Sequence, residues 1–144
     1  MLIEHILRRK GSDVVTVSAQ DPVTRAVAVL GEHNIGALVV AGDEGAIVGI
    51  LSERDVVRAL ADHGPAALQH KVGDLMTTEV TTCGLRATAD DLMSVMTERR
   101  IRHIPVVSDD GLVGIVSIGD VVKTRIDELE TERETLHEYI SGRS

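Results

Sequence analysis

One sequence pattern occurs twice in this chain. Residues 45–58 read GAIVGILSERDVVR, and residues 110–123 read DGLVGIVSIGDVVK. The glycine, serine and aspartate that the two segments share lie 65 positions apart, by subtraction of their residue numbers. This period exceeds that of most solenoid repeats, and two copies are too few for an array. We therefore expect two similar units that pack against each other.

The repetition extends upstream of these segments. At an offset of 66, residues 34–40 align with 100–106 and residues 13–17 align with 79–83. Nearly all of the chain before residue 127 therefore belongs to one copy or the other. The predicted parts are a first repeat at 1–62, a connection at 63–71, a second repeat at 72–126 and a C-terminal helical extension at 127–144.

The composition limits the partners that this protein can bind. A net charge of −8 opposes association with the phosphate backbone of nucleic acids and with anionic membranes. The chain has no Trp or Phe and one Tyr, so its core must be aliphatic and it offers no aromatic platform on which bases stack. We therefore expect neither a nucleic-acid nor a membrane partner.

Cysteine usage and hydropathy predict the compartment. Cys83 is the sole cysteine, so the chain forms no internal disulfide. No apolar run approaches the length of a membrane span or of the apolar part of a signal peptide. Together these features predict a reducing cytoplasm. Because Cys83 aligns with Val17, a small buried side chain is favoured over a reactive thiol.

Each copy has the pattern of a strand, a helix, two strands and a second helix. In the first copy, 14–17 alternates like a strand, and Asp21-Pro22 opens a helix that ends near 34–36. Two apolar runs then surround the turn signal at 42–45, and a helix follows from Ser52. These elements predict a mixed α/β fold, and the short connection between the copies predicts that the halves pack together.

The C-terminal extension has the pattern of a helix with one apolar side. Its apolar positions fall at spacings of four and three once Arg133 fills one of them: Val122, Ile126, Leu129, Leu136 and Ile140. This is a heptad seam of about two and a half repeats. The pattern fits a surface helix that covers an apolar groove, and it also fits a dimer contact. We favour self-association, because so acidic a helix needs its seam buried to persist.

These features together resemble a known family. Each copy has a helix, then a strand such as 104–107, then a glycine, an apolar pair, a serine, two variable residues and an aspartate. The chain resembles a tandem pair of cystathionine-β-synthase (CBS) domains over about residues 2–126. The resemblance implies an α/β (α+β) fold of two β-α-β-β-α repeats packed pseudo-symmetrically as a Bateman module, plus the extended C-terminal helix. It also implies a ligand that contains adenosine, such as AMP, ADP, ATP, S-adenosylmethionine or NAD.

A serine and an aspartate stand three residues apart at the start of a predicted helix in each copy: Ser52 with Asp55, and Ser117 with Asp120. This spacing is typical of a capping box, in which each side chain satisfies a backbone N–H of the first turn. The same position suits a ligand, because a helix N-terminus attracts phosphate and a carboxylate accepts both hydroxyl hydrogens of a ribose diol. The spacing alone leaves both roles open.

The resemblance assigns these residues to two clefts, each built from both repeats. It implies that Asp55 and Asp120 hold ribose while Ser52 and Ser117 approach phosphate. The family arrangement places four residues opposite Asp55: Thr78, Glu79, Ile101 and His103. It places four others opposite Asp120: Ser12, Asp13, Ile35 and Ala37.

The two clefts differ in charge. The first combines Arg54 with Arg102, where the second has Gly119 and Gly36. Because the planar guanidinium group suits phosphate oxygens, we expect the first cleft to prefer the more phosphorylated nucleotide. The neighbouring arginines at 99–100 fit equally well a solvated basic helix end.

Catalysis and metal binding find no support in the sequence. The six histidines show no i, i+4 pair and no cysteine companion, and no nucleophile is paired with a base at a known motif spacing. Glycine motifs of the Walker and dinucleotide-binding types do not occur. We therefore expect no enzyme activity, no metal site and no obligatory cofactor.

The sequence thus predicts a regulatory sensor that binds an adenosine-containing ligand between its repeats. We expect it to form a homodimer and to act in trans on a regulated protein. The alternative is a ligand-independent dimerisation or scaffold protein in which the serines and aspartates only cap helices, since a fold alone does not fix a function.

Overall fold

The computed structural model describes residues 1–142, and the last two residues of the predicted extension, 143 and 144, lie outside this range. The first half contains β1 (Thr16–Val17), α2 (Val23–His33), β2 (Ala37–Ala41), β3 (Ile47–Ser52) and α3 (Glu53–His63). The second half contains α5 (Ala89–Arg99), β4 (His103–Ser108), β5 (Gly111–Ser117) and α6 (Ile118–Ile140). Two short opening helices, α1 (Ile3–Lys10) and α4 (Val72–Leu75), precede the halves.

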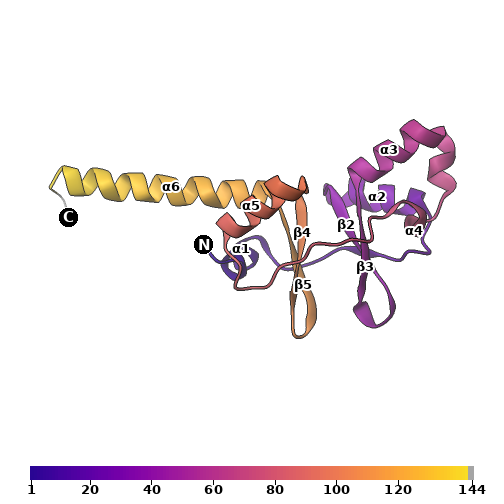
Figure 1. Ribbon diagram of the computed structural model, residues 1–144, viewed down its shortest axis with the longest axis horizontal. Coiled ribbons are helices and arrows are strands. Elements are labelled where there is room, and N and C mark those ends of the chain that lie inside the picture. Colours follow the sequence, from indigo (N-terminus) through magenta and orange to yellow (C-terminus); the bar gives the residue numbers. More distant parts are fainter. Residues whose placement is uncertain (143–144) are drawn as a thin grey trace.

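Two hairpins, each flanked by helices, stand side by side in the body of the molecule (Figure 1). The hairpin of β2 and β3 is antiparallel and pairs with β1 in parallel, which gives the order β1-β2-β3. The hairpin of β4 and β5 is also antiparallel, and a single parallel bridge joins Cys83 to Val106. The duplicated α/β fold and its C-terminal helix are therefore confirmed.

The opening helices are exchanged between the halves. The N–H of Ile3 in α1 donates to the carbonyl of Ala87 at 2.8 Å, in the second half. The N–H of Val72 in α4 donates to the carbonyl of Asp21 at 2.8 Å, in the first half. These two bonds occupy equivalent places, and the exchange ties each half to the segment that precedes the other.

Two aliphatic cores follow from this arrangement. One core unites α1 with α5 and the β4–β5 hairpin, and it includes Ile3, Leu92 and Ile104. The other unites α2, α3 and α4 with the β2–β3 hairpin, and it includes Leu38 and Leu51. Burial of these side chains supplies the main driving force for folding.

The first helix of each half ends on a residue in the left-handed conformation. Asn34 has φ 52° and Arg100 has φ 55°. Asparagine tolerates this region, whereas it is uncommon for arginine. At these residues the chain turns out of the helix and continues into β2 or β4. Gly36 and His103, which lie at the starts of these strands, line the cleft between the halves.

The helix α6 is the element that leaves the body. Its first turns pack on α5 and β5, and its second part projects alone (Figure 1). Every residue from 129 to 140 is exposed. No helix among residues 1–142 is long and apolar enough to cross a membrane.

Some elements differ from the predictions. The predicted strand at 14–17 is shortened to β1, and the equivalent strand near 80–83 is reduced to the bridge at Cys83. The chain at 79–81 instead lines a cleft. The helices α1 and α4 have no counterpart among the predicted elements.

Candidate functional site

The pairs Ser52–Asp55 and Ser117–Asp120 both form complete capping boxes. The backbone N–H of Ser52 donates to Oδ2 of Asp55 at 2.9 Å, and the backbone N–H of Asp55 donates to Oγ of Ser52 at 3.2 Å. The hydroxyl of Ser52 also reaches Oδ2 of Asp55 at 3.1 Å. One carboxylate oxygen of Asp55 is thus engaged in the cap.

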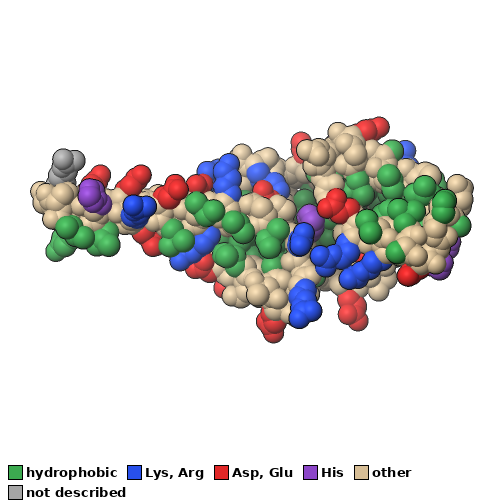
Figure 2. Space-filling model, turned by 90° about the horizontal axis from the view of Figure 1, so that it is seen from above, with side chains coloured by type: hydrophobic (Ala, Val, Ile, Leu, Met, Phe, Trp, Pro, Cys, Tyr) green, Lys and Arg blue, Asp and Glu red, His purple; other side chains and the backbone are tan. Residues whose placement is uncertain are grey.

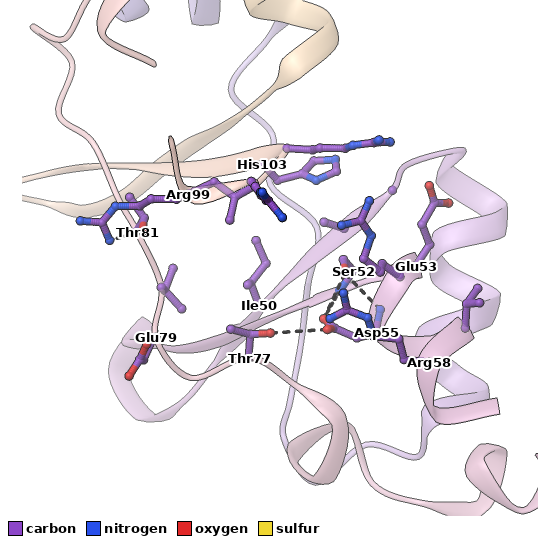
Figure 3. Close-up of a pocket in the computed structure, with 18 residues that line it drawn as sticks. Ile50, Ser52, Glu53, Asp55, Arg58, Thr77, Glu79, Thr81, Arg99 and His103 are labelled. Carbon is purple, nitrogen blue, oxygen red and sulfur yellow. Dashed lines mark hydrogen bonds between the residues drawn. The ribbon is translucent and has the colours of Figure 1, made fainter. Parts of the chain in front are cut away.

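The second oxygen of Asp55 faces a cleft of about 760 Å³ between the halves (Figure 3). The hydroxyl of Thr77 lies 3.5 Å from Oδ1 of Asp55. His103 and Arg99 of the second half stand across the cleft from Asp55. The apolar side chain of Ile50 lies between these two sides of the cleft (Figure 3). This volume and this mixture of apolar and polar walls suit a ligand of nucleotide size.

Basic side chains dominate the charge of this cleft. Five arginines line it, together with three carboxylates: Arg54, Arg58, Arg99, Arg100 and Arg102, with Glu53, Asp55 and Glu79. None of the five arginines forms an ion pair within residues 1–142. Lys and Arg side chains gather beside a histidine at the middle of the body (Figure 2). In a chain of net charge −8, this concentration favours an anionic ligand.

The structure brings most residues of the predicted first cleft together. Its walls include the two capping residues and the predicted residues from both halves: Ser52, Arg54, Asp55, Glu79, Ile101, Arg102 and His103. Thr78 is exposed and does not line the cleft, and Thr77 takes that place. The arrangement across two repeats therefore resembles the one that the family implies.

The residues predicted for the second cleft are more dispersed. Ala37 lines the first cleft, and Ile35 packs against the core of the first half. Ser12 and Asp13 are exposed. Gly119 follows Ser117 at the start of α6, as Arg54 does at the start of α3.

A lysine holds the aspartate of the second cleft. The ammonium of Lys10 donates to Oδ2 of Asp120 at 2.6 Å and to the carbonyl of Ile115 at 2.9 Å. Burial acts to raise the pKa of Asp120, but hydrogen bonds from Lys10 and Ser117 and the charge of Lys10 outweigh it. The pKa of Asp120 therefore lies below its ordinary value.

His103 lines the first cleft beside Gly36 of the first half. Its ring atoms Cε1 and Nε2 lie 3.2 and 3.3 Å from the position of a Cβ atom built on Gly36. Burial lowers the pKa of His103, Glu53 opposes this effect, and Lys10 and Arg102 add to it. The imidazole is therefore neutral at pH 7 and can accept a hydrogen bond as well as donate one.

Sequence reasoning missed several residues of the first cleft. Arg58 lies one helical turn after Arg54, so helical spacing predicts that both side chains lie on the same face of α3, toward the cleft. Thr77 follows α4 and lines the first cleft, while Lys10 is the last residue of α1 and contacts Asp120; no sequence signal predicts these two short helices. Their places depend on the exchange of these helices between the halves.

The described residues offer little for redox or metal chemistry. No group of three or more His, Cys, Asp or Glu residues within 1–142 is placed to hold a metal ion. Burial raises the pKa of Cys83 to about 11, so its thiol stays protonated and packs against the second core.

Comparisons with known proteins agree with this geometry. The CBS domain family model matches residues 3–62 and 72–127. A mitochondrial CBS domain-containing protein of Arabidopsis thaliana is 38% identical over 148 residues, which cover 97% of this chain and 72% of that protein. A CBS-domain-containing protein from Agrobacterium tumefaciens, solved by crystallography, has TM-score 0.84 and 46% identity, covering 87% of this chain and 99% of that one.

A further crystal structure is similar and carries ligands. It is the CBS domain pair of protein MJ0100 in complex with 5′-methylthioadenosine and S-adenosyl-L-methionine. Its TM-score is 0.79 at 26% identity, covering 89% of this chain and 98% of that chain. Two matched repeats, the exchanged opening helices and the shared fold lead to one conclusion: the chain belongs to the CBS domain family and is a tandem CBS pair.

Proposed function

We propose that this CBS pair is a regulatory sensor that binds an adenosine-containing ligand in its first cleft. The observation that carries this proposal is the position of Asp55. One of its carboxylate oxygens completes the cap of α3, and the other faces a cleft of about 760 Å³. A carboxylate in this position can accept the two hydroxyl hydrogens of a ribose.

The walls of the cleft favour a ligand that carries phosphate. Arg54 and Arg58 stand on one side of the cleft, and Arg99 to Arg102 supply three more guanidinium groups from the other side. The N-terminus of α3 adds its dipole. We therefore propose that AMP, ADP or ATP binds more tightly than S-adenosylmethionine, whose sulfonium is positive. The ligands in the MJ0100 structure support the adenosine part of this proposal.

A chain of contacts leads from the first cleft to α6. The N–H of Ile118, the first residue of α6, donates to the carbonyl of Arg102 at 2.8 Å. His103 pairs with Ser117 across the β4–β5 hairpin. A ligand that engages Arg102 and His103 therefore touches residues bonded to the start of α6. We propose that α6 transmits the bound state to a partner protein in trans.

The projecting part of α6 supports a homodimer. The exposed fraction of its seam ranges from 39% at Val122 to 74% at Ile140. Hydrophobic side chains follow one edge of the projecting helix (Figure 2). A helix of this kind gains stability when a second copy buries the seam. We propose that two chains pair along this edge.

The ligand-independent scaffold is the second candidate function. Its support is the pair of complete capping boxes, which give Ser52, Asp55, Ser117 and Asp120 a structural role. The two candidates differ in one respect, because a scaffold would not require the second carboxylate oxygen of Asp55 to face a cleft.

Isothermal titration of the protein with AMP, ATP, S-adenosylmethionine and NAD tests the proposal. We expect binding of at least one nucleotide, and we expect Asp55→Asn to weaken it about tenfold or more, because a charge-assisted hydrogen bond becomes a neutral one. Hydrogen exchange along residues 122–140 should slow or quicken when that nucleotide saturates the protein. Exchange that stays unchanged would exclude α6 as the output.

Asp91→Asn is the matched control. Asp91 completes the capping box of α5 with Thr88, in the same geometry as Asp55 and Ser52, but it does not line the cleft. Both variants should lose about 1 kcal/mol of folding stability through the cap. If the two variants bind nucleotide equally well, or if wild type binds none, the scaffold function is favoured.

The compartment is a separate part of the proposal. The sole cysteine, with its protonated thiol, supports a reducing environment such as the cytoplasm. The name of the Arabidopsis relative places that protein in mitochondria. Cell fractionation with an antibody against this chain distinguishes the two locations.

A further inference from the structure

The end of α1 and the segment after α4 differ in charge where they approach the two motif aspartates. Leu7 of α1 lies against β5 in the same way as Met76, which follows α4, lies against β3. By subtraction of residue numbers, these two positions are 69 apart. The same offset pairs Lys10 with Glu79, which lines the first cleft. The region around Asp120, which the sequence predicts to form the second cleft, therefore has a cation where the first cleft has an acid.

The backbone around this cation also differs between the halves. In the first half, the carbonyl of Ile50 accepts a hydrogen bond from the backbone N–H of Thr77 at 2.9 Å. In the second half, the equivalent carbonyl of Ile115 accepts the ammonium of Lys10 at 2.9 Å. The side chain of Lys10 thus donates to the carbonyl of Ile115, whereas the equivalent carbonyl of Ile50 accepts a backbone N–H.

Lys10 also pairs its charge with Asp120, the counterpart of Asp55, at the oxygen that the cap of α6 engages. Oδ2 of Asp120 already accepts hydrogen bonds from the backbone N–H and the hydroxyl of Ser117, at 2.9 and 3.0 Å. The ammonium of Lys10 adds a third donor at 2.6 Å. The ion pair is mostly shielded, since the side chains of Lys10 and Asp120 are 33% and 23% exposed. A neutral hydroxyl is a weaker partner for a carboxylate than an ammonium is.

From this geometry we infer that the side chain of Lys10 blocks ligand binding at the second cleft. Each chain would then bind one adenosine-containing ligand, at the first cleft. The inference rests on the proposed function for the identity of the ligand. A ligand at the second cleft would meet a carboxylate whose charge an ammonium already pairs, and the carbonyl of Ile115 holds that ammonium in place. It would also find Gly119 where the first cleft has Arg54.

Counting the binding sites for AMP by isothermal titration tests this inference. AMP carries the purine and the ribose diol with a single phosphate, so it depends less on the arginines of the first cleft than ATP does. We expect one site per chain in wild type and two in Lys10→Met, which keeps most of the length of the side chain and removes its charge. The added site should bind about tenfold or more tightly than any residual second binding to wild type. Asp120→Asn in the Lys10→Met background should abolish it.

Arg9→Met is the matched control. Arg9 is the preceding cation of α1, and its guanidinium pairs with Asp127 at 3.5 Å and not with the second cleft. This variant should keep one site. Two sites in wild type, or one site in both wild type and Lys10→Met, would overturn the inference.

The same titrations separate this inference from the proposed function. If wild type binds no AMP while Lys10→Met gains one site that Asp120→Asn removes, the role of Lys10 stands and the first cleft is not the AMP site. If neither protein binds AMP, both the inference and AMP binding at the first cleft are overturned. Thermal melting of each variant verifies that the measured protein is folded.

Discussion

At the scale of single residues, the proposed discrimination by phosphate at the first cleft rests on Arg102. Arg102 lines the cleft, and no ion pair within residues 1–142 engages its guanidinium group. We expect Arg102→Ala to weaken ATP binding about tenfold and AMP binding less, because a charge-assisted contact with a phosphate is lost. Isothermal titration of both nucleotides checks this.

Arg25→Ala, which removes a surface arginine paired with Asp21, should leave both affinities unchanged. Equal losses for ATP and AMP would contradict a role in phosphate discrimination.

His103 makes folding stability depend on pH. Its pKa in the folded protein is lowered, first by burial, with Glu53 and Asp120 opposing and Lys10 and Arg102 adding to the effect. As the pH falls below about 6.5, the unfolded chain binds a proton before the folded protein does, so stability is lost. Above that pH the imidazole is neutral in both states and this contribution is complete.

Urea unfolding from pH 7.5 to 5 measures this dependence. We expect the free energy of unfolding of wild type to fall more steeply below pH 6.5 than that of His103→Gln, which cannot take up the proton. Parallel curves for the two proteins would show that His103 titrates at its ordinary pKa in the folded state.

At the scale of elements, the pseudo-symmetry offers a matched pair of substitutions. A Cβ atom on Gly49 would lie 2.7 Å from Sδ of Met76 and 2.9 Å from the carbonyl oxygen of Thr77. A Cβ atom on Gly114 would lie 2.7 Å from Cδ2 of Leu7, at the end of a flexible side chain. The backbone carbonyl cannot yield as easily as a leucine methyl.

We therefore expect Gly49→Ala to destabilise the protein by about 1–3 kcal/mol, and Gly114→Ala to cost less. Urea unfolding of the two variants gives the comparison. Because Thr77 lines the first cleft, Gly49→Ala should also weaken nucleotide binding, whereas Gly114→Ala should not. The reverse order of stability would mean that the segment of Thr77 adapts more readily than the core around Leu7.

The same elements show how far the sequence predicts this molecule. The helices α2, α3 and α6 and the strands of both hairpins follow from apolar period, glycine turns and the Ser-x-x-Asp caps. The helices α1 and α4 span 8 and 4 residues, too short for a local signal, and packing on the opposite half holds them. The positions of Lys10 and Thr77 could not be predicted either, because they depend on where these two short helices pack. Most of the residues predicted for the first cleft gather there, because capping fixes Ser52 and Asp55 locally.

At the scale of the whole molecule, α6 sets the proposed assembly. Its 23 residues span about 35 Å, and the part beyond the body has only solvent around it in a single chain. Half-exposed apolar residues on one edge, such as Ile126 at 50% and Leu129 at 47%, make an unpaired helix unfavourable in water. A dimer that buries this edge removes that cost.

Leu129→Glu tests the dimer because it places a charge in the seam. We expect wild type to sediment as a dimer in analytical ultracentrifugation and Leu129→Glu to sediment as a monomer, since a buried unpaired carboxylate opposes the contact. Thr131→Glu adds the same charge two residues along, on the opposite side of the helix, and should remain dimeric. Circular dichroism should show less helix in the Leu129→Glu monomer, because the projecting part of α6 loses its support while the CBS pair stays folded. A wild-type monomer with full helix content would mean that α6 persists without a second copy, and the proposed transmission through α6 would then have to operate within one chain.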